Sequence, residues 1–143
     1  MKSITEILQV ARTTEGELLQ SDRAEGPHGL RIPNSTQMPN EVLDNYIADL
    51  NEAELKVLLY LVRKTFGYNK VMGDAIALSQ FMNGTKRKDG TIQDRGTGLS
   101  KTSILQALGT LEKIGFVEIT KKSKEDGSKD TSFYRLKIEE ITR

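Results

Sequence analysis

Apolar residues recur at helical spacing in two long segments of the chain. Asn51 and Glu54 have the spacing of a capping box, and the residues that follow form a wide apolar face up to Gly67, where we expect the helix to stop. The apolar positions of this helix are Leu55, Leu58, Leu59, Leu61, Val62 and Phe66. The second helix spans about residues 101–114, from an N-cap at Ser100 to Gly115. Its predicted buried positions are Ile104, Ala107, Leu108 and Leu111.

Shorter patterns predict the remaining elements. Residues 3–12 and 40–48 favour short helices, the second with Asn40 as its cap and an apolar face formed by Val42, Leu43, Tyr46 and Ile47. Residues 75–77 favour a short strand, and Ser79 is placed to cap a short helix that ends at Gly84. Residues 84–98 hold four glycines and six charged residues, which predicts a polar, mobile loop.

The end of the chain alternates between apolar and polar positions. Val117 and Ile119 form one such run, and Tyr134, Leu136 and Ile138 form another. The lysine-rich stretch between them contains Asp126-Gly127, a hairpin-turn dipeptide. The expected fold is mainly α with a small β-hairpin (α+β). A helix pair followed by a hairpin, or wing, matches a winged helix-turn-helix.

The three prolines divide the chain. Pro27, Pro33 and Pro39 lie within thirteen residues, so residues 24–39 should be irregular. We expect an N-terminal arm at residues 1–38, a winged-helix domain at residues 39–138 and a C-terminal tail at residues 139–143.

Composition excludes several classes of chemistry. The chain of 143 residues has no cysteine and only one histidine, His28, which excludes disulfides, thiolate metal sites, a cysteine nucleophile and a multi-histidine metal centre. No run of 18 apolar residues or signal peptide is visible, so we expect a cytoplasmic protein with no membrane partner. We also expect no cofactor.

A net charge of +1 conceals a separation of sign along the chain. Residues 1–55 carry 4 Lys/Arg and 10 Asp/Glu, whereas residues 84–137 carry 12 and 7. An acidic part followed by a basic part indicates nucleic-acid binding by the basic part, although two unrelated solvated surfaces would give the same arithmetic.

The predicted helix over residues 101–114 is a candidate for reading the DNA major groove. Gln106 would pair with adenine, and Lys101 would reach guanine or phosphate. Leu105 would touch a thymine methyl group or pack against the 84–98 loop. Expected contacts to bases or to phosphates at the first turn are Lys101, Thr102, Ser103, Leu105, Gln106 and Thr110. The alternative is an ordinary solvated helix surface.

Two basic clusters are candidates for contacts to the DNA backbone. The wing carries Lys121, Lys122, Lys124 and Lys129, and the 84–98 loop carries Lys86, Arg87, Lys88 and Arg95. Lysines on a hairpin also protect an exposed sheet edge from aggregation, which is the alternative for the wing.

Two segments of the chain, Arg63-Lys-Thr-Phe-Gly-Tyr-Asn-Lys and Leu78-Ser-Gln-Phe, form a fairly specific pattern. With other segments over about residues 36–138, they resemble the N-terminal domain of the phage replication protein O family. The resemblance implies a winged-helix domain that binds duplex DNA at a replication origin. Members that start replication usually carry a further C-terminal region that recruits the helicase machinery. A chain that ends at Arg143 is therefore expected to be a stand-alone DNA binder or a fragment.

We expect a sequence-specific double-stranded DNA-binding protein of phage or mobile-element origin, and no enzyme. The Gly96–Thr102 segment fails as a phosphate-binding loop because Arg95 and Ser100 stand where that motif needs glycine. One alternative is a winged-helix transcriptional regulator. Another is a protein-interaction module in a replication or transcription assembly. A homodimer that pairs through residues 3–12 or the first domain helix would fit a palindromic site.

Overall fold

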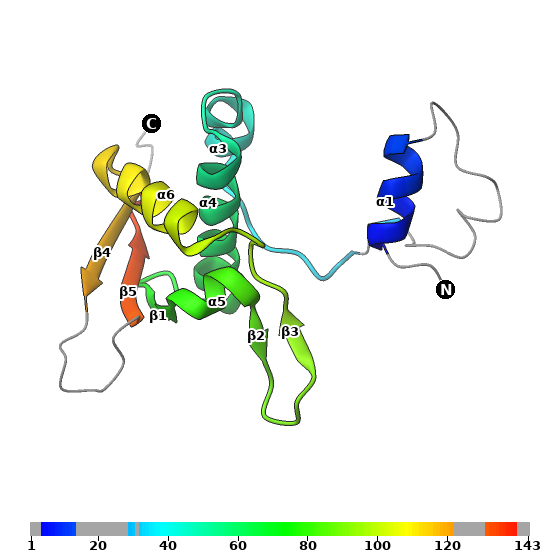
Figure 1. Cartoon of the computed structure of the whole chain (residues 1–143). Helices are drawn as coiled ribbons and strands as arrows, with labels where there is room; N and C mark the ends of the chain where they lie inside the picture. Colours follow the sequence, from blue (N-terminus) through cyan, green and yellow to red (C-terminus); the bar gives the residue numbers. More distant parts are fainter. Residues whose placement is uncertain (1–3, 14–28, 31, 122–130, 140–143) are drawn as a thin grey trace. The chain divides into compact units, whose positions relative to one another are not determined.

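The computed structural model describes residues 4–13, 29–30, 32–121 and 131–139 of the chain (Figure 1). The chain divides into two units, residues 1–35 and 36–143, and each is described by itself. The first unit contains helix α1 (Ile4–Thr13), which confirms the helix expected near residues 3–12. The predicted division into arm, domain and tail remains a prediction.

The second unit is a mixture of helices and small antiparallel sheets, which confirms the α+β class. Its elements in chain order are α3 (Asn40–Asp44), the 3-10 helix η1 (Tyr46–Ala48), α4 (Glu52–Thr65), the 3-10 helix η2 (Phe66–Tyr68), β1 (Asp74–Ala77), α5 (Leu78–Asn83), β2 (Thr85–Lys86), β3 (Ile92–Asp94), α6 (Lys101–Lys113), β4 (Val117–Lys121) and β5 (Thr131–Leu136).

The larger sheet has three strands in the order β1-β5-β4, so the strand before α5 joins the two that follow α6. Ile76 lies opposite Ser132 and Ile119 lies opposite Tyr134. Strands β2 and β3 pair separately.

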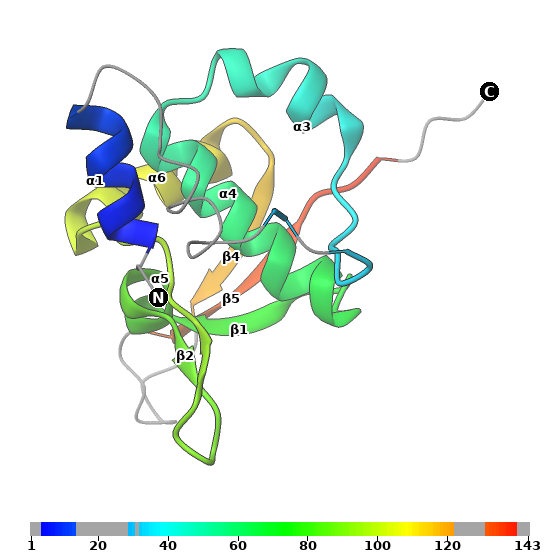
Figure 2. The same ribbon diagram turned by 90° about the vertical axis from the view of Figure 1, so that its right-hand side faces the viewer.

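The core lies where α4, α5, α6 and the three-stranded sheet meet (Figure 2). The predicted inward face of α6 is confirmed, since Ile104, Ala107, Leu108 and Leu111 are buried. The Phe81 ring is fully buried and packs against the rings of Tyr60 and Tyr134, each with a centroid distance of 5.3 Å. Apolar burial of this kind is the main force that holds such elements together.

Helix α4 begins as predicted, and it ends at Thr65, two residues before the predicted stop at Gly67. The Glu54 amide donates to the Asn51 side chain over 2.8 Å, and the Asn51 amide donates to the Glu54 carboxylate over 3.0 Å. Gly67 does not stop the chain, which continues as η2 to Asn69, whose left-handed φ of 59° ends the helical path. Leu59 was wrongly expected in the apolar face and is 38% exposed.

The helix predicted over residues 40–48 is divided in two. Asn45 interrupts it between α3 and η1, with φ −119° and ψ −56°. Asn40 lies inside α3, and Pro39 occupies the N-cap position. Leu43 and Ile47 are about half exposed, because only one side of this short segment meets the core.

Helix α5 begins one residue before the predicted cap. Ala77 is its N-cap, and its amide donates to the Gln80 side chain over 2.7 Å, so Ser79 is not the cap. Gly84 ends the helix at φ +90°, as predicted.

The prediction that residues 84–98 form an irregular loop is wrong in part, because the segment contains the β2–β3 hairpin. The predicted mobility of this segment stays a prediction. Strand β5 also begins three residues earlier than expected, at Thr131, and Ile138 lies beyond its end. The predicted Asp126-Gly127 turn lies outside the described residues.

Candidate nucleic-acid interface

Helix α6 is bounded by a capping residue at its start and a glycine after its end. The Ser103 amide donates to the Ser100 hydroxyl over 3.2 Å, which caps the first turn as predicted. Gly115 follows the last turn with φ +89°, a conformation that favours glycine. Because the buried face of α6 packs on α4, the orientation of α6 about its own axis is fixed. The same packing determines which residues α6 presents outward.

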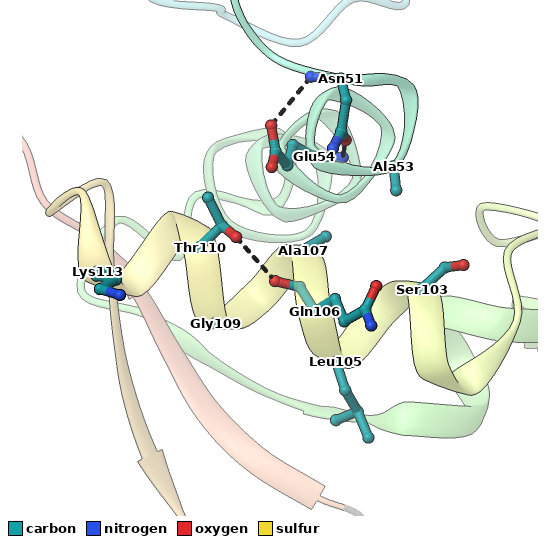
Figure 3. Close-up of a pocket in the computed structure, with 10 residues that line it drawn as sticks. All are labelled: Asn51, Ala53, Glu54, Ser103, Leu105, Gln106, Ala107, Gly109, Thr110 and Lys113. Carbon is teal, nitrogen blue, oxygen red and sulfur yellow. Dashed lines mark hydrogen bonds between the residues drawn. The ribbon is translucent and has the colours of Figure 1, made fainter.

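The outward face of α6 carries the side chains predicted to read DNA. Lys101, Thr102, Gln106 and Leu105 are exposed, and Leu105 is 51% exposed. Ser103 and Thr110 are half-buried. The Thr110 hydroxyl donates to the Gln106 backbone carbonyl over 3.1 Å, which leaves its lone pairs available as acceptors (Figure 3).

An open groove runs between α6 and the first turn of α4 (Figure 3). It is lined by Asn51, Ala53, Glu54, Ser103, Leu105, Gln106, Ala107, Gly109, Thr110 and Lys113. The sequence reasoning missed Lys113. The spacing of the residues could have identified it, because Gln106, Gly109 and Lys113 are separated by three and four positions and so lie on one helix face.

The segment that forms the α4 side of this groove is acidic, although Glu54 is its one carboxylate among the residues that line the groove. Residues 36–55 carry five carboxylates and no lysine or arginine. Two of them, Glu52 and Glu54, lie in the first turn of α4, where they complement the helix dipole. Glu54 closes the capping box, and Glu52 pairs with Lys56 over 3.1 Å.

The β2–β3 hairpin carries the second predicted basic cluster. Lys86, Arg87, Lys88 and Arg95 are all exposed. The tip is closed by the Arg87 amide, which donates to the Thr91 carbonyl over 2.8 Å. Hydrogen bonds from the Thr91 hydroxyl and amide lower the pKa of Asp89, the acidic residue of the tip.

A buried ion pair beneath this hairpin was not foreseen from the sequence. The Lys64 ammonium lies 2.5 Å from Asp94 Oδ2, and the side chains are 7% and 24% exposed. Lys64 also donates to the Thr85 hydroxyl over 3.1 Å, and the Tyr60 hydroxyl donates to Asp94 Oδ1 over 2.9 Å. These bonds connect the C-terminal half of α4 to both strands of the hairpin.

The same contacts set the ionisation of the pair. Burial raises the pKa of Asp94, but hydrogen bonds from Lys64, Tyr60 and the Gly96 amide outweigh it and hold the pKa below its ordinary value. Burial raises the pKa of Tyr60 well above its ordinary value, and the bond to Asp94 adds to this shift, so Tyr60 stays a donor.

The predicted wing is described only at its base. Lys121 is exposed at the end of β4, whereas Lys122, Lys124 and Lys129 lie outside the described residues. Arg135 and Glu118 lie opposite each other on β5 and β4 and pair over 2.6 Å. The pKa of Glu118 is lowered by this partner.

Over the described ranges, no group of three or more His, Cys, Asp or Glu side chains is placed to hold a metal ion. No helix in this part of the chain is long and apolar enough to cross a membrane. His28 lies outside it.

The chain matches a known protein family over most of its length. The family described as bacteriophage replication protein O matches residues 34–123, a range that includes α4, the β2–β3 hairpin and α6. This match confirms the resemblance seen in the sequence. No curated protein and no solved structure matches the chain.

Proposed function

Because the chain belongs to the bacteriophage replication protein O family and has a role in phage replication, we propose that its second unit is a winged helix-turn-helix that binds duplex DNA at a replication origin. The protein acts by binding and carries out no catalysis. Its partners are double-stranded DNA and other replication proteins.

The order of the elements supports this architecture. Helices α5 and α6 form the helix pair, and β4 and β5 form the hairpin that follows the second helix. Strand β1, which precedes α5, pairs with β5 and so ties the base of the wing to the helix pair. The connection between α5 and α6 is long for this motif, and the β2–β3 hairpin occupies it.

The single observation that carries the proposal is the exposed polar face of a helix capped at Ser100. A helix of this size fits the major groove, which is about 12 Å wide. Gln106 presents both a donor and an acceptor, the pattern that pairs with adenine, and Leu105 is apolar and suits a thymine methyl group. Lys101, Thr102, Ser103 and Thr110 supply further contacts to bases or to phosphates near the first turn.

Phosphate contacts come from the basic residues around this helix. They include the predicted set Lys86, Arg87, Lys88, Arg95, Lys121, Lys122, Lys124 and Lys129, to which we add Lys113. Such contacts position the protein on the duplex, whereas α6 supplies the sequence preference. The exposure of Lys101 and Gln106 favours this function over that of a protein-interaction module.

Selection of bound duplexes from a random pool tests the proposal. We expect the wild-type chain to select one sequence. Gln106→Ala should lose about 1–3 kcal/mol of discrimination, roughly 5- to 150-fold, at a single base pair. Gln37→Ala is the matched control, since Gln37 is exposed and lies outside α6.

Two results would overturn the proposal. One is that no duplex is bound even at low salt. The other is that binding and selection are the same in wild type, Gln106→Ala and Lys101→Ala.

A further inference from the structure

The β2–β3 hairpin is joined to α5 at its base by close backbone contacts. Gly84 and Gly96 face each other there, both with positive φ, and a Cβ on Gly84 would lie 2.0 Å from the Asp94 carbonyl oxygen. The Thr97 amide and hydroxyl both donate to the Phe81 carbonyl, over 2.8 and 2.7 Å. These contacts fix the direction in which the hairpin projects from the rest of the second unit.

Side chains of α4, η2 and α5 form hydrogen bonds and an ion pair with the two strands of the hairpin. The buried Lys64–Asp94 pair connects α4 to β3, and Gln80 of α5 donates to the Thr85 hydroxyl of β2 over 3.3 Å. Gln93 of β3 donates to the hydroxyl of Tyr68, whose ring lies 4.4 Å from the Arg63 guanidinium. A hairpin with only two strands is marginal alone, so these bonds position it.

The hairpin projects from the side of α6 that faces away from the first turn of α4. In Figure 1 that first turn lies above α6, and the β2–β3 tip and the Lys121 end of β4 both lie below it. Figure 2 shows the same vertical arrangement after rotation. The exposed lysines of the hairpin thus lie on the side opposite the acidic residues 36–55.

The charge that the hairpin presents to solvent is positive. Lys86, Arg87 and Lys88 are exposed at the tip and outnumber the exposed Asp89 there, and Arg95 follows β3. The carboxylate of Asp94 faces Lys64 in the interior. Four fully extended residues, the separation of Gly84 and Lys88, span at most roughly 13 Å at 3.3 Å per residue, comparable to the major-groove width of about 12 Å.

We propose that the β2–β3 hairpin is a second wing, which contacts DNA phosphates beside the groove that α6 enters, through Lys86 and Lys88. This inference rests on the proposed function. With this second wing, the bound DNA site extends beyond the α6 contacts at one flank only. It does not extend at the other flank, because the carboxylates of residues 36–55 lie on that side. Lys64 and Asp94 are positioning residues that aim the hairpin and do not touch DNA.

Hydroxyl-radical footprinting on the selected duplex, combined with a salt titration, tests the second wing. The full-length double variant Lys86→Ala/Lys88→Ala should lose the protection of backbone sugars at one flank. The slope of log K against log salt should become shallower by about 2, one unit for each phosphate contact. Arg87 is left unchanged because its guanidinium donates to the Ile92 carbonyl over 3.0 Å and shapes the tip.

The matched control is Lys56→Ala/Lys70→Ala, which removes two exposed lysines elsewhere in the second unit. It should leave the footprint unchanged. Asp94→Asn should lose protection at the same flank while the backbone sugars around α6 stay protected, with the experiment run below its unfolding midpoint.

The outcomes separate the two proposals. Gln106→Ala should alter sequence preference and keep the flank. A double variant with the wild-type footprint and salt slope, in a protein that still selects its duplex, overturns the second wing alone. A wild-type chain that selects no duplex overturns the proposed function and the second wing with it.

Discussion

Lys64 is the residue whose environment is least ordinary. Its ammonium is the one charged group among the buried side chains of α4, and its charge is matched by Asp94, thirty positions later. Removing one partner of a buried pair leaves the other charge uncompensated, which costs far more than breaking an exposed pair.

We predict that Asp94→Asn lowers the free energy of unfolding by about 3 kcal/mol, the lower end of the range for a broken buried pair. Urea denaturation followed by circular dichroism measures this change. Lys56→Gln, which breaks the exposed pair with Glu52, should cost at most about 1 kcal/mol. Equal losses in the two variants would contradict the assignment of Asp94 to a buried pair.

The same pair predicts a pH dependence. Asp94 has a pKa below its ordinary value in the folded chain, so its contribution is fully present above the unfolded pKa of about 4 and is lost as pH falls through the folded value. Between pH 5 and pH 3, wild type should therefore lose stability more steeply than Asp94→Asn. Parallel curves from thermal unfolding at several pH values would argue against this source of acid sensitivity.

At the scale of elements, helix ends separate into those held by a side chain and those that are not. Asn51 and Ser100 accept hydrogen bonds at the starts of α4 and α6. Asn40 occupies a similar place in the sequence but lies inside α3, and no side chain caps that helix. Residue type alone does not distinguish these cases, because a capping side chain works only with an extended backbone at the N-cap position.

We predict that Asn51→Ala lowers the free energy of unfolding by about 1 kcal/mol, the usual cost of a lost N-cap. Asn40→Ala should change it by less than about 0.5 kcal/mol, as for an ordinary surface position. Chemical denaturation of both variants measures the contrast. A larger loss in Asn40→Ala would show that the cap lies where the sequence alone suggested.

At the scale of the whole molecule, the charged clusters of the second unit lie on different sides of its fold. The carboxylates of residues 36–55 belong to α3 and the start of α4, whereas the basic cluster Lys86, Arg87, Lys88 lies on the β2–β3 hairpin, at the other end of the unit (Figure 1). Under the proposed function, a charge distribution of this kind orients the protein as it approaches DNA and makes association depend on salt.

The second unit has its own apolar core, so we predict that residues 36–143 fold without the first unit. The fragment should unfold cooperatively, with a midpoint within a few degrees of the full chain, as a change below about 1 kcal/mol implies. Calorimetry of both chains measures this. A fragment that lacks a cooperative transition would show that the core depends on residues 1–35.

The expected homodimer is a further prediction at this scale. If helix α1 pairs two protomers, sedimentation should show a dimer of the full chain and a monomer of residues 36–143. A full chain that stays monomeric at high concentration would contradict this pairing.

The sequence by itself determined the features that depend on neighbours along the chain. The capping box at Asn51, the cap at Ser100 and the buried face of α6 follow from residues within a few turns of one another, as does the division of charge. Only the tertiary structure decided which polar segments form strands and which lysine is buried. The β2–β3 hairpin shows almost no alternation, and Lys64 meets its partner thirty residues away, so neither leaves a local signal. Both depend on long-range packing of α4, α5 and the hairpin.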